Sequence, residues 1–432
     1  MKKKIFKPLG LAMSHNSFVA FSGIITALLI INYFSEELQG LYYTIISFTA
    51  LKVFLDAGFS NVIISFVSQN KNKIEIGDKV VFKEDGFKNL SNIFNYSRKR
   101  FLLVSCFGFI ILHLLAWVFF KDYISYESVI YWFFLSLFFS LNIVLIPYLC
   151  VIEGLDYLSS LFSFRIRYSI INSISSWLVI FFEGGVLCLL VLNFTMLIQN
   201  FLYITKHNYI FKELHKGKID NEYIRPIVRP FGLKIGVSFL TGYFLNNGIV
   251  PIIFKFISPS LAGLYGLSWS LFSIISTLPK QFIIVIRPKL GLLFKEKSYK
   301  QFWNLFINNF FKSISLYLFL ALSVLALHFL FDHTLIVKRL LNQNNFILMS
   351  ILFLVLNVIG NFTHFFRPQL KEPLYFLNVI STISVLIFIF YFIDNLSVEY
   401  LLLSIIITYL LFGITGLTHY TYKFHKTYIN NS

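Results

Sequence analysis

The chain has 432 residues, of which 57% are hydrophobic and only 13% are charged, and its mean hydropathy is +0.74. Soluble globular domains carry roughly 25% charged residues, so this composition excludes an ordinary soluble protein. The formal charge of +17 would suggest nucleic acid as a partner of a soluble protein, but in a membrane protein it raises the question of which loops hold the charge. We therefore expect an all-α, polytopic membrane protein with no nucleic-acid partner.

Apolar runs long enough to cross a bilayer recur along the chain. A hydrocarbon core of about 30 Å needs roughly 20 helical residues. Runs of this kind, bounded by charge, proline or asparagine, number twelve and lie near 16–34, 41–66, 101–120, 128–151, 164–182, 185–205, 235–254, 260–286, 308–331, 345–366, 373–393 and 400–421. Only Phe-Glu-Gly-Gly separates the fifth run from the sixth. Because Glu183 is costly in mid-bilayer, we predict a tight helical hairpin there, with one broken helix as the alternative.

The basic residues are distributed unevenly between the two sides of this arrangement. With both termini placed in the cytoplasm, the inner segments hold 32 Lys and Arg residues and the outer segments hold 4. Cytoplasmic loops of membrane proteins are enriched in Lys and Arg. The charge pattern therefore predicts cytoplasmic termini and an even number of spans.

The spans divide into two groups of six. Residues 206–234 form a long, basic, polar connection, which predicts a first lobe at 1–205, a cytoplasmic linker at 206–234 and a second lobe at 235–432. Long basic segments follow the second and eighth spans, at 67–100 and 280–312. This shared rhythm indicates a parallel repeat, a plan common in transporters whose two lobes rock around a central cavity.

Motifs of catalysis and cofactor binding are missing from the sequence. It has neither a Gly-x4-Gly-Lys-Ser/Thr phosphate loop nor a His-Glu-x2-His metal pair, and its longest extramembrane segment has about 34 residues. We expect no enzyme activity, catalytic residue, metal or cofactor. Polar groups embedded in the membrane must then do the work.

The second span contains two such groups, Lys52 and Asp56, at positions i and i+4 of one helix face. A charge inside the membrane costs roughly 2.5–3.5 kcal/mol on insertion scales, so it normally faces a bundle interior or an aqueous cavity. One interpretation is a self-neutralised pair that joins helices. The other places Lys52 in a substrate cavity, with Asp56 setting its position.

The eighth span carries a polar, cationic stripe. Ser273, Thr277 and Lys280 recur at i, i+4 and i+7, and Pro279 and Pro288 predict a kinked helix that lines water. The alternative for Lys280 is that its ammonium snorkels to the cytoplasmic interface.

The tenth span carries a second polar stripe. Asn357, Asn361, His364 and Arg367 lie within an arc of about 120° on a helix. Amides and an imidazole on one face suit sugar hydroxyls, but they equally suit hydrogen bonds between helices. We therefore include all four as candidate substrate-binding residues and leave both interpretations open.

Short motifs carry a resemblance to a known family. They are Leu51-Lys52-Val53-Phe54-Leu55-Asp56-Ala57-Gly58-Phe59-Ser60-Asn61-Val62, Ile152-Glu153-Gly154, Ala262-Gly263-Leu264-Tyr265 and Leu278-Pro279. With the twelve-span layout, the chain resembles the Wzx-type O-antigen and capsular polysaccharide flippases of the multidrug/oligosaccharidyl-lipid/polysaccharide (MOP) exporter superfamily. The resemblance implies two MATE-like six-helix lobes in the bacterial cytoplasmic (inner) membrane. It also implies a lipid-linked oligosaccharide substrate, contact with membrane lipids, and a polysaccharide polymerase and chain-length regulator as partners.

Charge supplies a mechanism for the implied reaction, which moves an undecaprenyl-diphosphate-linked oligosaccharide across the membrane by alternating access. Lys52, Lys280 and Arg367 could neutralise the diphosphate while amides and hydroxyls bind the glycan. One rival is a drug or cation antiporter of the same superfamily, which needs central carboxylates. Another is a polysaccharide polymerase or ligase, which carries a long outer loop, whereas the longest outer connection here is about 332–344.

Overall fold

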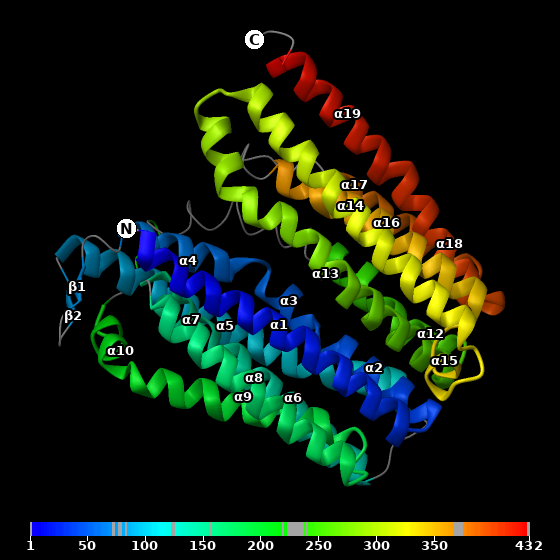
Figure 1. Ribbon diagram of the computed structural model, residues 1–432. Helices are drawn as coiled ribbons and strands as arrows, with labels where there is room; N and C mark the ends of the chain where they lie inside the picture. Colours follow the sequence, from blue (N-terminus) through cyan, green and yellow to red (C-terminus); the bar gives the residue numbers. More distant parts are fainter. Residues whose placement is uncertain are drawn as a thin grey trace. The chain divides into compact units, whose positions relative to one another are not determined.

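The computed structural model is built from long helices (Figure 1). It describes residues 2–70, 74–76, 80–82, 84–121, 126–155, 157–217, 220, 222, 237, 240–366 and 375–429. Two compact units divide the chain, one comprising residues 1–34 and 45–243 and the other residues 35–44 and 244–432. The predicted all-α membrane architecture is confirmed.

The first unit contains most of the amino-terminal helices. Its elements are α1 (Lys2–Tyr33), the second part of α2 (Glu36–Thr49), α3 (Leu51–Asp56), α4 (Phe59–Asn70), β1 (Ile74–Ile76), β2 (Val80–Phe82), α5 (Glu84–Phe120), α6 (Tyr126–Val144), α7 (Ile146–Gly154), α8 (Leu158–Phe181), α9 (Leu187–Lys206) and α10 (Asn208–Leu214). The strands form a small antiparallel hairpin in which Glu75 lies opposite Val81. This hairpin falls within the long basic segment predicted at 67–100.

The second unit begins with the first part of α2 and resumes at Phe244. Its further elements are η3 (Phe244–Gly248), α12 (Ile249–Phe256), α13 (Pro259–Lys295), α14 (Tyr299–Leu330), α15 (Leu335–Lys338), α16 (Gln343–Phe366), α17 (Tyr375–Tyr391), η5 (Ile393–Asn395), α18 (Val398–Thr408), η6 (Tyr409–Ile414), α19 (Thr415–Phe424) and η7 (His425–Ile429). Within this unit, α13 packs against α12, α14 and α16, and α16 also packs against α18. Helix α13 continues through Pro279 and Pro288 as one helix.

Nine helical stretches in the described part of the chain are long and apolar enough to cross a membrane. Three of the twelve apolar runs read from the sequence fall outside this set. The run at 164–182 matches α8, the run at 373–393 matches the 17-residue α17, and the run at 235–254 lies partly outside the described residues. The chain is a multi-pass membrane protein.

The predicted helical hairpin at Glu183 is present. Helix α8 ends at Phe181, α9 begins at Leu187, and the two helices pack against each other. Glu183 and Gly185 have positive φ angles of 58° and 55°, which reverse the chain in a few residues. A left-handed conformation of this kind is easy for glycine and costs other residues energy. Residues 164–205 therefore form two separate helices, and the alternative of one broken helix is wrong.

The described beginning of the predicted linker is held on α5. Ser91 donates to the carbonyl oxygen of Leu214 at 2.6 Å, and Asn95 donates to the carbonyl oxygens of Leu214 and Gly217 at 2.8 and 3.0 Å. Residues 223–236 lie outside the described residues, so the predicted extent of the linker and the lobe boundaries stay predictions.

Residues 35–44 pack with the second unit although they were expected in the first lobe. A side chain at Gly40 would overlap the carbonyl oxygen of Pro259, and one at Gly263 would lie 2.9 Å from the carbonyl oxygen of Glu36. Gln39, fully buried, donates to the carbonyl oxygen of Gly263 at 2.8 Å. The paired glycines let the first part of α2 approach the start of α13 closely, as small residues do between membrane helices.

Candidate functional site

In the first unit, the candidate residues lie at a break between α3 and α4. Helix α3 ends at Asp56, and Ala57 and Gly58 follow with positive φ angles of 48° and 70°. The amide of Ala57 donates to the carbonyl oxygens of Phe54 and Val53 at 2.9 and 3.3 Å, which closes α3. The sequence Asp-Ala-Gly-Phe therefore ends one helix and starts another.

Asp56 stabilises the start of α4. One carboxylate oxygen, Oδ1, accepts a hydrogen bond from the backbone amide of Ser60 at 3.1 Å and another from the Ser60 hydroxyl at 2.6 Å. A carboxylate at a helix amino terminus satisfies amides that have no partner within the helix and interacts favourably with the helix dipole. This contact gives Asp56 a structural role that does not involve a lysine.

Lys52 lies one turn before Asp56 and is half-buried. No ion pair joins the two side chains, both of which the structure describes. Their charges still interact, and Arg100 of α5 also acts on Asp56. The guanidinium of Arg100 lies 4.0 Å from the ring centre of Phe59, in a cation–π contact. Asp56 thus feels the charges of two cations while its hydrogen bonds go to Ser60.

A second charged contact in the first unit joins α7 to α8. Arg165 donates to Glu153 at 2.8 Å, and both side chains are partly exposed. Gly154, which follows Glu153 in the motif, is buried where a side chain would lie 2.6 Å from Cβ of Val67 and 3.0 Å from the carbonyl oxygen of Ile64. The Ile152-Glu153-Gly154 motif therefore combines a close approach of α7 to α4 with an engaged carboxylate.

In the second unit, Lys280 is held on α13 by a serine one turn earlier. Its ammonium donates to the hydroxyl of Ser276 at 3.3 Å, and Ser276 in turn donates to the carbonyl oxygen of Ser273 at 3.0 Å. Thr277 is exposed, and its hydroxyl donates to the carbonyl oxygen of Ile274. The polar face that meets Lys280 is therefore formed by Ser276 rather than by Thr277.

The stem of Lys280 lies against α16 at a glycine. A Cβ at Gly360 would be 3.8 Å from Cε of Lys280. Asn357 and Asn361 flank this glycine and are fully buried. Their amide groups donate to the carbonyl oxygen of Phe353 at 2.8 Å and to Ser313 of α14 at 3.0 Å. The α16 amides thus make hydrogen bonds within and between helices.

The remaining candidates of the tenth span are only partly placed. His364 is half-buried near the end of α16, whereas Arg367 lies outside the described residues. Within the described part of the chain, no carboxylate forms an ion pair with Lys280 and no group of His, Cys, Asp and Glu side chains could hold a metal ion.

Two functional candidates were missed in the sequence. Arg100 and Arg165 were counted only among the basic residues near the inner ends of the spans. Arg100 follows Arg98 and Lys99, and nothing in this run separates it from its neighbours. The Glu153 to Arg165 spacing of twelve residues likewise predicts no contact within one helix, and the pair forms because α7 and α8 are different helices.

Solved structures of membrane transporters share this fold. An inward-facing MATE family multidrug resistance transporter of the MOP superfamily aligns with a TM-score of 0.64 and 13% identity, covering 98% of this chain and 99% of that chain. A Vibrio cholerae MATE transporter gives 0.60 and 12%, covering 98% and 97%. A MOP superfamily transporter from Pyrococcus furiosus gives 0.55 and 14%, covering 98% and 96%.

No protein-family model matches the sequence, and no curated protein matches it. The fold of the chain is nevertheless clear from the solved structures, and it is that of MATE-type transporters of the MOP superfamily. The likeness in fold covers nearly the whole length of the chain.

Proposed function

We propose that this protein is a flippase that moves a lipid-linked oligosaccharide across the cytoplasmic membrane by alternating access. The head group would be a glycan joined to undecaprenyl diphosphate, and the prenyl chain would remain in the bilayer. Lys52 and Lys280 would neutralise the diphosphate, with Arg367 as a third candidate. Arg100 joins this set because its charge acts on Asp56.

The proposal rests on which charged side chains already have a partner of opposite charge or a hydrogen-bond partner. Asp56 accepts two hydrogen bonds from Ser60, and Glu153 is paired with Arg165. Lys280 has a hydroxyl partner and, in the described part of the chain, no carboxylate at ion-pair distance. A cation in a poorly solvated site favours an anionic ligand, and diphosphate oxygens accept charge-assisted hydrogen bonds.

The fold fits a multidrug or cation antiporter equally, so the sign of charge is the feature that separates the two functions. An antiporter of this kind requires a carboxylate free to bind a cation, whereas Asp56 and Glu153 are both engaged. The Pyrococcus furiosus transporter is described as having a binding pocket of reversed polarity that suggests a different function. Proteins of this fold can therefore differ in the charge that they offer to a substrate.

A membrane polymerase or ligase is supported less well. The expected outer connection between α14 and α16 contains only the four-residue helix α15, and Thr334 and Leu340 lie on either side of it. A segment of this length offers little room for a set of catalytic residues.

The test is complementation of a flippase-null bacterial strain with the Lys52→Gln/Lys280→Gln variant. Surface glycan should fall by about tenfold or more at matched protein levels, because the diphosphate loses two charge-assisted contacts worth about 1.5–3 kcal/mol each. Arg at either position should retain part of the export, since charge is kept while geometry changes. The matched control, Lys300→Gln/Lys312→Gln, removes the same charge from two exposed lysines and should export normally.

Full export by the Lys52→Gln/Lys280→Gln variant would contradict the cationic site. Drug resistance conferred on an efflux-deficient strain, lost on replacing Asp56 and kept on replacing Lys52, would favour the antiporter instead.

A further inference from the structure

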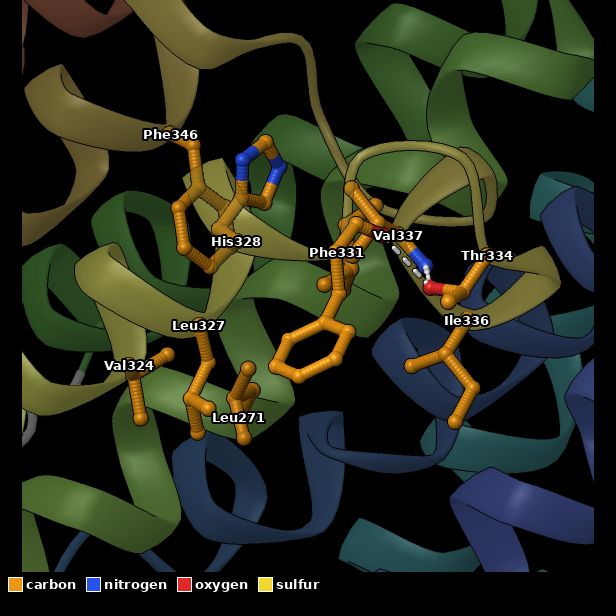
Figure 2. Close-up of a pocket in the computed structure, with 10 residues that line it drawn as sticks. Leu271, Val324, Leu327, His328, Phe331, Thr334, Ile336, Val337 and Phe346 are labelled. Carbon is orange, nitrogen blue, oxygen red and sulfur yellow. Dashed lines mark hydrogen bonds between the residues drawn. The ribbon is translucent and has the colours of Figure 1, made fainter.

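The second unit contains a cavity of about 390 Å³ among α13, α14, α15 and α16 (Figure 2). Its volume lies within the range of about 300–1,000 Å³ that is typical of small-molecule sites. The cavity is distinct from the candidate residues described above, none of which lines it. It lies at the end of α14 and beside the short connection to α16, which the charge pattern assigns to the outer side of the membrane.

The wall of this cavity is almost entirely apolar. Eight of its ten lining residues are aliphatic or phenylalanine, and the other two are His328 and Thr334. The hydroxyl of Thr334 donates to the carbonyl oxygen of Phe331 at 2.7 Å and also caps α15. His328 is buried, stacks on Phe346 at 4.3 Å and donates through Nε2 to the carbonyl oxygen of Leu341 at 3.0 Å. These contacts hold both polar side chains as fixed parts of the wall.

The cavity opens among side chains that face the surroundings of the protein. Leu327 and Phe331 line it and are 54% and 53% exposed, and Leu330 between them is 74% exposed. Leu327 and Leu330 belong to a stretch apolar enough to span a membrane, Tyr299–Leu330. In a bilayer the molecules beside such a surface are lipids.

The end of the span also marks the depth of the cavity in the membrane. Asp332 and His333 directly follow the exposed apolar residues, and their side chains are 3.2 Å apart and open to solvent. Lys338 is exposed one residue after Val337, which lines the cavity. Charged groups at this level belong with lipid head groups, so a chain entering from there would be the upper part of a lipid tail.

We propose that this cavity binds one acyl chain of a membrane phospholipid, with the head group at the level of Asp332 and Lys338. The burial of apolar surface of the chain supplies the free energy of binding. Binding at this place would join α13, α14 and α16 through one ligand. The proposal does not depend on which substrate the protein transports.

The experiment uses the full chain in nanodiscs of phosphatidylethanolamine and phosphatidylglycerol that contain a trace of phosphatidylglycerol with a diazirine in one acyl chain. After irradiation, mass spectrometry should find adducts concentrated on Leu271, Val324 and Leu327, above those at the exposed Phe319 and Phe390. Equal labelling of the cavity and of these exposed comparison residues would overturn the proposal.

Two variants fill the cavity from opposite walls, Val324→Trp on α14 and Leu271→Trp on α13. Either should lower cavity adducts by about tenfold, since losing the burial of two methylene groups already corresponds to that factor. Leu322→Trp is the matched control, because Leu322 lies on the same helix as Val324, is 62% exposed and does not line the cavity. Because one of the two tryptophan variants could fail to fold, the other keeps the proposal testable.

Unchanged cavity labelling in either folded variant would refute the site. An excess of unlabelled phosphatidylglycerol should compete with the probe. Stronger competition by undecaprenyl phosphate at the same concentration would overturn the assignment of the occupant as a phospholipid chain.

Discussion

The two units place their membrane lysines in different surroundings. In the first unit, Lys52 lies on a six-residue helix that ends at Asp56 with two left-handed residues. In the second unit, Lys280 lies within α13, a helix of 37 residues, and its stem lies beside Gly360 of α16. The first lysine is positioned by a helix break, and the second by helix packing.

The carboxylate marks the main chemical difference between these surroundings. Asp56 contacts the start of α4 through Ser60, and its negative charge also acts on Lys52 and Arg100. Lys280 has the Ser276 hydroxyl as its partner. A similar sequence pattern of hydroxyl or carboxylate and lysine on one helix turn therefore gives a partly compensated cation in one unit and, among the described residues, an uncompensated one in the other.

The largest effect is expected where the second unit depends on close packing. Gly40→Ala should destabilise the protein by about 3 kcal/mol or more, because the new methyl group would overlap the carbonyl oxygen of Pro259, a backbone atom that cannot rotate away. Thermal unfolding of the purified protein in detergent measures this loss. Gly291→Ala is the control, since a Cβ there meets nothing within 4 Å.

The result also tests which unit depends more on its glycines. Gly58→Ala places a side chain at a φ of 70°, which costs about 1–2 kcal/mol, so it should destabilise the first unit less than Gly40→Ala destabilises the second. A larger effect at Gly58 would reverse the contrast between a helix break and helix packing.

The helices could be predicted from the sequence because a helix that crosses a bilayer needs a long apolar run. Each of the twelve predicted runs falls at least partly on a helix of the described chain, and the turn at Glu183 followed from the cost of a buried charge. The packing of residues 35–44 with the second unit could not be predicted from the sequence. It depends on the pairing of Gly40 with Gly263, 223 residues away, and one sequence contains no signal for such a pairing.

For the candidate site, the sequence predicted which polar residues lie in the helices but not which contacts they make. Helical periodicity identified Lys52, Asp56, Lys280 and Asn361 as embedded polar groups, but it did not identify the partners that Asp56 and Asn361 have in the structure. Ser60 becomes the partner of Asp56 because α4 begins there, and Ser313 meets Asn361 because α14 packs on α16. Periodicity could not choose between Lys52 and Ser60, each four residues from Asp56, and it could not reveal the contact of Asn361 with another helix.

An intermediate effect is expected at Asp56. Asp56→Ala should lower the free energy of unfolding by about 1 kcal/mol, the usual contribution of a helix amino-terminal cap, whereas Asp56→Asn keeps an oxygen acceptor and should be nearly as stable as the parent. Thermal unfolding measures the stability, and surface glycan measures the export.

The Asn variant separates the two transport functions. If Asp56 mainly holds the helix break, Asp56→Asn should export glycan at close to the parental level. An antiporter that binds its cation through this carboxylate would lose transport in Asp56→Asn despite normal stability, and that outcome would end the assignment of Asp56 as a structural residue.

The smallest effect is expected where the described beginning of the linker meets α5, at His215, which lies in none of the stretches long and apolar enough to cross a membrane. His215 lies 2.6 Å from the guanidinium of Arg98, and burial together with this cation lowers the pKa of His215 below its ordinary value of 6.5. Arg98 can only donate, so the imidazole must accept and be neutral. Folding therefore favours the unprotonated form. The contribution to stability is complete above about pH 6.5 and is lost as the pH falls through the folded-state pKa.

Because the pair is exposed, solvent screening reduces this contribution to a fraction of a kcal/mol. Hydrogen exchange of α10 amides, corrected for the intrinsic effect of pH, should show weaker protection at pH 5 than at pH 7.5, while the core of α16 should be unaffected. His215→Gln keeps an acceptor for Arg98 without a group that titrates in this range, so it should remove the pH dependence. His333→Gln, at a side chain 97% exposed, should retain it. Equal protection of α10 at both pH values in the parent protein would show that its contact with α5 rests on the Ser91 and Asn95 hydrogen bonds alone.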